Sequence, residues 1–248
     1  MHPPLKARRV VYAALPIAVA TALALGGCTA SPATAEANSV AWLYNVFLAA
    51  AGVVFVVVAA LIGWSVIRYR GQAGDASLPP QTHGNLILEV VWWALPTLLV
   101  IGLFVISAQV LNATDKRSPS GAVRVRVEGF QWQWRFTYLD SGVQLVGLPD
   151  RPPQLVLPVG EQISFELVSA DVIHSFYVPR FLVKRDTIPG LTNHVDLTID
   201  RPGIYSGQCA EFCGLLHARM VFSIRAVTPA DFERWLSGQR ALPPSPSP

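Results

Sequence analysis

The sequence predicts two membrane-spanning helices followed by an all-β domain outside the membrane. The chain of 248 residues is 52% hydrophobic and only 14% charged, and its long apolar runs fall in the first 111 residues. After residue 112, apolar and polar side chains alternate, as they do in half-buried strands. The shortage of charge argues against a disordered chain, an ordinary cytosolic domain or a nucleic-acid-binding protein, so no nucleic-acid partner is expected. Three cysteines are too few for a disulfide scaffold.

Residues 1–27 have the features of a secretory signal. Three basic residues precede an apolar run over residues 10–25, which is short for a membrane span. The run ends in Leu-Gly-Gly-Cys28, which resembles the lipobox of bacterial lipoproteins and predicts acylation of Cys28. The alternative is an ordinary cleavage site beside an unmodified cysteine. Residues 28–39, rich in Ala, Ser and Thr, are expected to form a flexible linker.

Residues 40–112 predict a hairpin of two membrane spans. No charged residue occurs over residues 40–67, and a second apolar run covers residues 86–111. Each exceeds the roughly 20 residues that a span requires. Arg68 and Arg70 follow the first run, so the positive-inside rule places the loop between the spans in the cytoplasm. We therefore expect a multi-pass protein of a bacterial cell (plasma) membrane whose last domain lies on the outer, periplasmic face.

One carboxylate, Glu89, interrupts the second apolar run about one turn inside its cytoplasmic end. An ionisable residue in a span is a functional hypothesis by default, often as part of a proton path. The alternative is a side chain that reaches the membrane surface and has no further role.

Residues 113–238 predict the outer β domain. Alternation over residues 123–128 indicates one strand, and residues 130–138 would place five aromatic side chains on one face of a second. Shorter runs at 155–157, 163–168, 175–178, 194–199 and 220–224 add strands to a sandwich or Greek-key barrel. Thr228 is expected to cap a helix that ends at Gly238. Residues 239–248 would be a disordered Pro/Ser tail.

One segment carries the chemistry. Its side chains are two thiols, an imidazole and a thioether, with a further imidazole upstream: Cys209, Cys213, His217, Met220 and His174. This soft set suits copper. Two thiolates can bridge two metal ions, with the weak positions left to Met220 and to the main-chain carbonyl of Glu211. A Cys209–Cys213 disulfide, a zinc site and a thiol redox pair are the alternatives, although structural zinc sites rarely use Met.

These motifs together resemble subunit II of haem–copper cytochrome c oxidases, over residues 40 to about 237. The resemblance rests on Gln131-Trp132-Gln133-Trp134, on the run from His174 to Gly190, and on the segment from Glu89 to Pro96. It implies that residues 113–238 form a cupredoxin-like Greek-key barrel with a dinuclear copper centre, called CuA in this family. It also implies that the copper ligands are His174, Cys209, Glu211 through its carbonyl, Cys213, His217 and Met220.

The resemblance implies further roles. Trp132 would accept the electron from cytochrome c, whereas the residue pattern alone favours a core aromatic there. Glu211 and Asp186 would hold magnesium shared with subunit I, and Glu89 would stand at the mouth of a proton path. Haem would lie only in the partner, subunit I, where oxygen is reduced to water with proton translocation. Subunit III would be a further partner.

The sequence departs from the family in ways that bear on the electron donor. Gln133 stands where many members have Tyr, and Thr137 where members that dock a basic cytochrome c often carry an acid. From Ala113 onward there are 14 basic and 13 acidic residues. Strong steering of a basic partner needs a negative surface, so we expect a cytochrome c that is membrane-bound or not strongly basic. The competing functions are a copper-containing subunit of a nitric oxide reductase and a membrane-anchored copper carrier.

Overall fold

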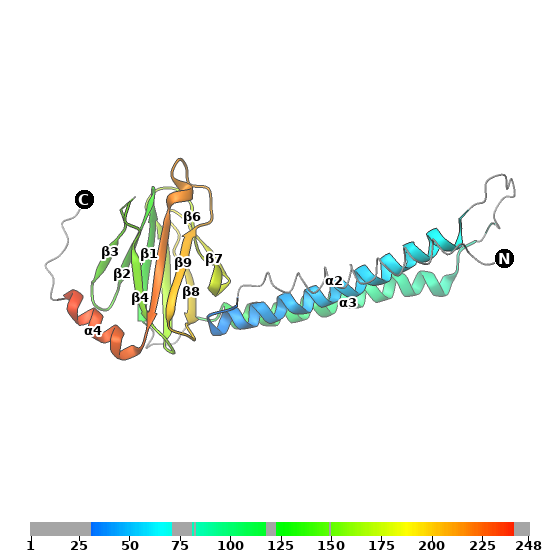
Figure 1. Ribbon diagram of the computed structural model, residues 1–248, viewed down its shortest axis with the longest axis horizontal. Coiled ribbons are helices and arrows are strands. Elements are labelled where there is room, and N and C mark those ends of the chain that lie inside the picture. Colours follow the sequence, from blue (N-terminus) through cyan, green and yellow to red (C-terminus); the bar gives the residue numbers. More distant parts are fainter. Residues whose placement is uncertain (1–30, 71–80, 82, 118–122, 149, 241–248) are drawn as a thin grey trace, which may run out of the picture. The chain divides into compact units, whose positions relative to one another are not determined.

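The computed structural model describes residues 31–70, 81, 83–117, 123–148 and 150–240 (Figure 1). The expected signal segment, Cys28 and residues 241–248 lie outside the described residues. Within them the elements are α2 (Ala35–Arg68), α3 (Leu86–Thr114), β1 (Val123–Phe130), β2 (Gln133–Tyr138), β3 (Gln144–Val146), β4 (Gln154–Pro158), β5 (Gln162–Ser169), β6 (His174–Val178), η2 (Pro179–Phe181), β7 (Val183–Thr187), β8 (Asn193–Thr198), β9 (Gly203–Cys209), η3 (His217–Arg219), β10 (Val221–Val227) and α4 (Pro229–Arg240).

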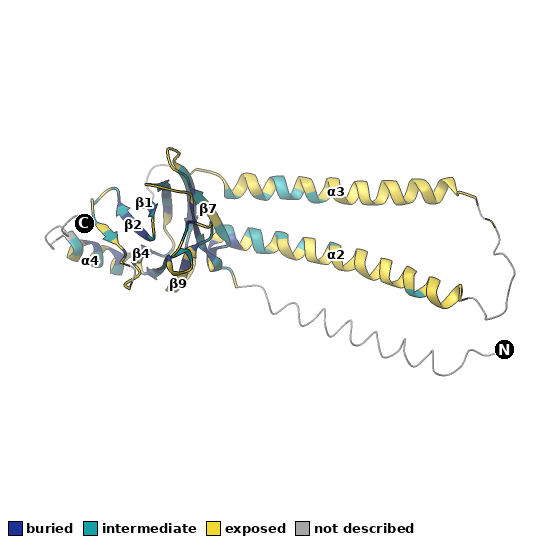
Figure 2. Ribbon diagram, turned by 90° about the horizontal axis from the view of Figure 1, so that it is seen from above, coloured by how far each residue is buried: buried dark blue, intermediate teal, exposed yellow. Residues whose placement is uncertain are grey.

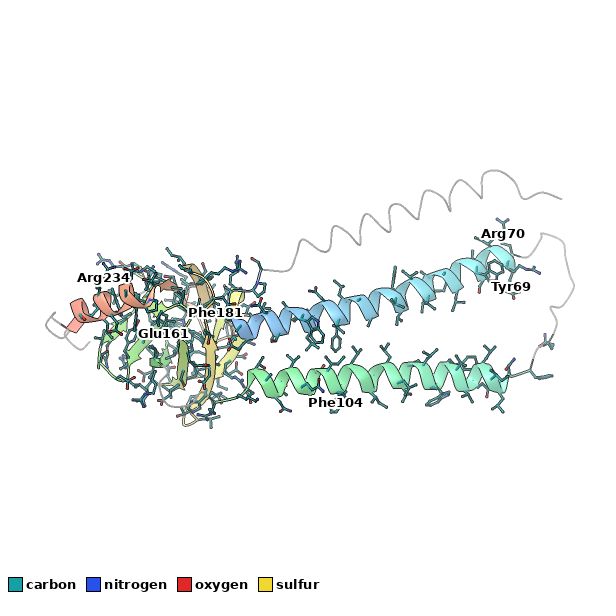
Figure 3. The ribbon with its side chains drawn as sticks, turned by 90° about the horizontal axis from the view of Figure 1, so that it is seen from below. Tyr69, Arg70, Phe104, Glu161, Phe181 and Arg234 are labelled. Carbon is teal, nitrogen blue, oxygen red and sulfur yellow. The ribbon has the colours of Figure 1, made fainter. Side chains whose placement is uncertain are left out.

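Both long helices are apolar enough and long enough to cross a membrane. α3 starts where Asn85 caps it, because the Asn85 side-chain oxygen accepts hydrogen bonds from the main-chain N–H groups of Ile87 and Leu88. Most side chains of both helices are exposed, apart from half-buried ones in the first turns of α2 and the last turns of α3 (Figure 2). They project outward along the helices, and Tyr69 and Arg70 follow the end of α2 (Figure 3). This apolar surface requires lipid or neighbouring helices around it. The two predicted spans are confirmed.

α2 begins at Ala35, five residues before the expected start of the first span at residue 40. Thr34 caps the helix by accepting a hydrogen bond of 3.0 Å from the N–H of Ala37. Ala33 donates its N–H to the carbonyl of Arg180, and the Glu36 carboxylate accepts from the N–H of Thr198. The side chains of Ala33, Thr34 and Ala37 are buried, and their small size permits this close contact with the β domain. The expectation of a flexible linker over residues 28–39 is therefore wrong for residues 33–39.

The described part of the β domain is a sandwich of two five-stranded sheets, in the orders β3-β2-β1-β5-β8 and β4-β10-β9-β6-β7. The β1–β5 and β4–β10 pairs are parallel, and the other pairs are antiparallel. An aromatic cluster fills the space between the sheets: Phe176 and Phe222 stack with centroids 4.9 Å apart, and Trp134 meets Phe222 edge-on at 5.5 Å. Such packing holds the ends of β6 and β9 in fixed positions.

Two local expectations are wrong. The aromatic run is not one strand, because β1 ends at Phe130, residues 131–132 form a turn, and β2 begins at Gln133 in antiparallel register with β1. Trp134, Phe136 and Tyr138 face the core, but Trp132 lies in the turn. The last helix also continues through Gly238 to Arg240, since a single glycine costs a helix only about 1 kcal/mol. The runs that form β3, β7 and β9 were not expected as strands.

Candidate metal centre

The end of one sheet gathers the sulfur and imidazole side chains. His174 is the first residue of β6, Cys209 is the last residue of β9, and Met220 directly precedes β10. Phe176 pairs with Cys209 across β6 and β9, and the N–H of Cys209 donates to the carbonyl of Met220. Figure 1 shows the loop between β9 and β10 at this end of the sandwich, next to β6. The sheet therefore fixes both ends of the loop and the histidine facing it.

The sulfur atoms lie within one small space. The Sγ atoms of Cys209 and Cys213 are 3.8 Å apart, and both cysteines are free. That separation is far longer than the roughly 2.05 Å of a disulfide bond. The Nδ1 atom of His217 lies 3.6 Å, and the Sδ atom of Met220 lies 3.8 Å, from Cys213 Sγ. The carbonyl of Glu211 is 3.3 Å from Cys209 Sγ.

His174 completes the group. A ring nitrogen of His174 and the two sulfurs lie within 4.8 Å of one another. The ring is fully buried, and Asp171 Oδ1 lies 2.8 Å from its Nε2 atom. Its Nδ1 atom has no hydrogen-bond partner among the described residues. A buried nitrogen left without a partner costs stability unless a ligand occupies it, and a carboxylate on the other nitrogen is the usual arrangement for a metal-binding histidine.

The pKa values of the two thiols also indicate a metal site. Burial opposes ionisation of Cys209, but the neighbouring His174 and nearby main-chain groups lower the pKa of its thiol. Burial, together with the negative charge on Cys209, raises the pKa of the Cys213 thiol. One thiolate therefore disfavours the second unless cations are bound between them. The residues present fit a pair of copper ions, for which thiolate, imidazole and thioether are suitable ligands.

An exposed turn binds directly to the loop that carries the sulfurs. The indole Nε1 of Trp132 and the amide Nε2 of Gln131 donate to the carbonyl of Cys213, at 3.0 Å and 2.8 Å. The N–H of Gln131 donates to Asp171 Oδ2 at 2.7 Å. Sequence reasoning singled out Trp132 but gave Gln131 and Asp171 no role in holding the site. Gln131 directly precedes Trp132, and Asp171 stands three residues before His174.

The remaining predicted residues lie around the site or apart from it. The Glu211 carboxylate is about half exposed, with the ammonium nitrogen of Lys184 3.9 Å away. Asp186 pairs with Ser175 across β6 and β7, and the carbonyl of Ser175 accepts the N–H of Ala210, next to Glu211. Glu89 is exposed in the first turn of α3, where it lines a shallow groove with Trp93 and Thr97. It belongs to another element and takes no part in the sulfur cluster.

Comparison with protein families gives matches along most of the chain. Residues 148–227 match the family described as "Cytochrome C oxidase subunit II, periplasmic domain", and residues 21–110 match its "transmembrane domain". The chain is 36% identical over 208 residues to "Cytochrome c oxidase subunit 2" of Alkalihalophilus pseudofirmus, covering 81% of this chain and 59% of that protein. It is 33% identical over 244 residues to "Probable cytochrome c oxidase subunit 2" of Streptomyces coelicolor, covering 83% of this chain and 76% of the other.

A solved structure also matches part of the chain. The periplasmic domain of subunit II of cytochrome oxidase from Bradyrhizobium japonicum is 32% identical and covers 50% of this chain and 97% of its own, with a TM-score of 0.46.

Proposed function

This chain belongs to the cytochrome c oxidase subunit II family, and on that basis we propose that it is the electron-accepting subunit of a haem–copper oxygen reductase. It is a membrane protein with two spanning helices and a β domain outside the lipid. The observation that supports the proposal most strongly is the cluster formed by the free thiols of Cys209 and Cys213 and the imidazole of His174. The Nδ1 atom of that imidazole has no hydrogen-bond partner among the described residues. The nitric oxide reductase and copper-carrier alternatives are not favoured by the relatives.

The side chains of the cluster fit a pair of copper ions. His174 and His217 would each supply an imidazole, Cys209 and Cys213 the two thiolates, and Met220 and the carbonyl of Glu211 the weak ligands. When bound, a pair of copper ions held by these residues would supply a one-electron redox couple. Asp171 holds the His174 ring by its Nε2 atom, so that Nδ1 faces the sulfurs.

Trp132 would be the point where the electron arrives from cytochrome c. Its indole is half-buried, so one edge is open to a partner, while its N–H is bonded to the main chain of Cys213. Gln131 anchors the same carbonyl and fixes the turn. Haem and the oxygen chemistry would belong to subunit I, with subunit III as a further partner.

We also propose roles for three carboxylates. Asp186 pairs with Ser175 in the sheet, Glu211 follows Ala210, whose N–H donates to the Ser175 carbonyl, and the two carboxylates would take magnesium at the boundary with subunit I. The ammonium nitrogen of Lys184 lies 3.9 Å from the Glu211 carboxylate, so a positive charge already stands beside it. Glu89, in the groove near the start of α3, would receive protons from the cytoplasm. We propose that the β domain lies on the periplasmic face of the bacterial cell membrane, because Arg68 and Arg70 favour the cytoplasm for the loop between the spans, and that Cys28 is acylated in the mature protein.

The proposal is tested on the oxidase complex purified with this chain, by metal analysis and oxygen uptake driven by cytochrome c. Cys213→Ser is expected to lower copper content and to slow oxygen uptake about tenfold or more, while haem content stays unchanged. Copper and activity that survive the substitution would contradict the proposal. A chain that binds copper but purifies without a haem-bearing partner would instead be a carrier.

A further inference from the structure

Thr187 carries a buried hydroxyl group that stability alone does not explain. Its side chain is fully buried, and its Oγ1 atom has no hydrogen-bond partner among the described residues. A buried hydroxyl without a partner lowers the stability of a fold, whereas valine fills a similar space without that cost. The position of the hydroxyl therefore indicates a role in the neighbouring site.

The Thr187 side chain lies beside the ring of His174. Thr187 ends β7 and pairs directly with His174, the first residue of β6, so the two side chains share one face of the sheet. A Cβ atom placed on Gly129, in β1 of the opposite sheet, would lie 3.0 Å from Thr187 Oγ1 and 2.9 Å from Cδ2 of His174. The hydroxyl oxygen and the imidazole therefore adjoin the same glycine, in the space between the sheets.

Aromatic rings form part of the surroundings of these two side chains. The indole of Trp134 meets the His174 ring edge-on with centroids 6.2 Å apart, and the ring of Phe176 lies 6.1 Å from that indole. All four side chains are fully buried. In such a dry, weakly polar place the dipole of a hydroxyl is poorly screened. A change of charge on the imidazole is therefore felt by Thr187 Oγ1 more strongly than it would be in water.

We propose that the Thr187 hydroxyl lowers the reduction potential of the copper pair through the ring of His174. The inference rests on the proposed function, in which His174 binds copper by Nδ1. The ring then carries more positive charge when the pair is oxidised than after the pair has gained one electron. A hydroxyl without a partner can turn its hydrogen away from a positive ring, so that its oxygen stabilises the oxidised form. Thr187 is a positioning residue, because it acts on the metal through His174.

The test uses the intact purified oxidase, held without oxygen and equilibrated with known ratios of ferricyanide to ferrocyanide. One electron passes from ferrocyanide to the oxidised copper pair, so ferrocyanide becomes ferricyanide as the pair is reduced, and no proton moves. Electron paramagnetic resonance of the oxidised pair gives the ratio of ferricyanide to ferrocyanide at which half of it is reduced. In Thr187→Val, which keeps the shape of the side chain but lacks the hydroxyl, this ratio should rise about threefold.

Two further variants separate the hydroxyl from the methyl group. Thr187→Ser keeps the hydroxyl and should stay within about 1.5-fold of the natural ratio. Thr187→Ala lacks the hydroxyl and should raise the ratio as Thr187→Val does, so the test remains valid if valine prevents assembly. An unchanged ratio in the variants without a hydroxyl would overturn the inference, and so would an equal rise in Thr187→Ser.

The shape of the resonance signal gives an independent readout. It should be the same in the natural protein and in all three variants, because His174 remains a ligand and only the charge around it changes. An altered splitting in Thr187→Val and Thr187→Ala would overturn the inference, since the residue would then act on the geometry of the ligand.

The natural complex separates this inference from the proposed function. If its oxidised form contains no copper, or has no signal from an electron shared by two copper nuclei, the proposed function fails. If that signal is present and the ratio is the same in the natural protein, Thr187→Val and Thr187→Ala, only the role of Thr187 is contradicted.

Discussion

The indole nitrogen of Trp132 donates a 3.0 Å hydrogen bond to the main-chain carbonyl of Cys213. An aromatic ring that reaches the surface is thereby bonded directly to a residue whose sulfur lies in the cluster. Gln131 donates to the same carbonyl at 2.8 Å, so the turn and the loop are joined twice. Substituting Trp132 and Gln131 separately distinguishes the role of the indole ring from the role of the hydrogen bonds that hold the turn to the loop.

Trp132→Phe keeps an aromatic ring but removes the N–H donor and the larger indole. Oxygen uptake driven by cytochrome c should fall about tenfold or more, while copper content and uptake driven by a small reductant stay unchanged. The measurement is steady-state oxygen consumption with each electron source. Equal loss with both sources would show that the variant damages the site itself.

Gln131→Met is the matched comparison, since it removes the other donor to the Cys213 carbonyl and leaves the indole in place. A neutral hydrogen bond contributes about 1 kcal/mol, so we expect no more than about a fivefold loss in the reaction with cytochrome c. A loss as large as that of Trp132→Phe would assign both residues to anchoring of the loop and none to electron acceptance.

Gly129→Ala should displace the ring of His174, one of the proposed copper ligands. A Cβ atom at Gly129 would lie 2.9 Å from Cδ2 and 3.1 Å from Cγ of His174, and 3.0 Å from Thr187 Oγ1. Because the ring is fully buried, relief of these contacts must shift the His174 ring or the strand that carries it. We expect weaker copper retention during dialysis against a chelator and an altered optical spectrum. An unchanged spectrum would show that His174 is not a ligand in the conformation described here.

Tyr138→Phe should lower stability without changing the metal site. The buried hydroxyl donates to the carbonyl of Val156 at 2.6 Å and accepts its N–H at 3.0 Å. Loss of both bonds should cost about 1–3 kcal/mol, measured by thermal unfolding. Retention of the natural melting temperature would contradict this role.

The same residue predicts a dependence on alkaline pH. Burial raises the pKa of Tyr138, so the folded domain keeps its phenol neutral where the unfolded chain ionises. Its contribution to stability is complete below the unfolded pKa of about 10 and declines above it. The melting temperature of Tyr138→Phe should therefore fall less steeply than that of the natural protein above about pH 10. Parallel profiles would be inconsistent with a buried neutral phenol.

Thr34→Ala should loosen the start of α2. The side chain caps the helix and is fully buried against the β domain, so its loss should cost about 1 kcal/mol. Hydrogen exchange should become faster at Ala37, whose N–H loses its acceptor. Ser39→Ala, about one turn further along α2, is the control and should leave exchange at Ala37 unchanged. Equal exchange in the two variants would restore the flexible-linker interpretation for residues 33–39.

The sequence was sufficient for features that depend on local spacing. Cys209, Cys213, His217 and Met220 fall within one short loop, so their convergence needs few long-range contacts. Both apolar runs are longer than a bilayer requires, so the sequence alone predicts them as membrane spans. Sequence reasoning groups His174 with the loop only by the chemistry of its side chain, and its proximity arises from the pairing of β6 with β9.

The features that sequence reasoning missed depend on tertiary structure. Phe130 and Trp132 share a polar-apolar alternation with β2, and only pairing of Phe130 with Gln133 shows that a turn interrupts it. Gly129 gives no sequence signal, because its importance comes from the His174 ring against it. Residues 33–39 have the composition of a linker, yet contacts with β8 and the Arg180 carbonyl order them. In each of these places burial and tertiary contacts, rather than local sequence propensity, determine the structure.

Electron paramagnetic resonance of the oxidised, purified oxidase tests most directly whether Cys209 and Cys213 bridge a pair of copper ions. The structure and the ligand set predict a signal in which one unpaired electron is shared equally by two copper nuclei, and its loss in Cys213→Ser while haem remains. A signal from a single copper nucleus, or a chain without copper that contains a Cys209–Cys213 disulfide, would contradict the assignment.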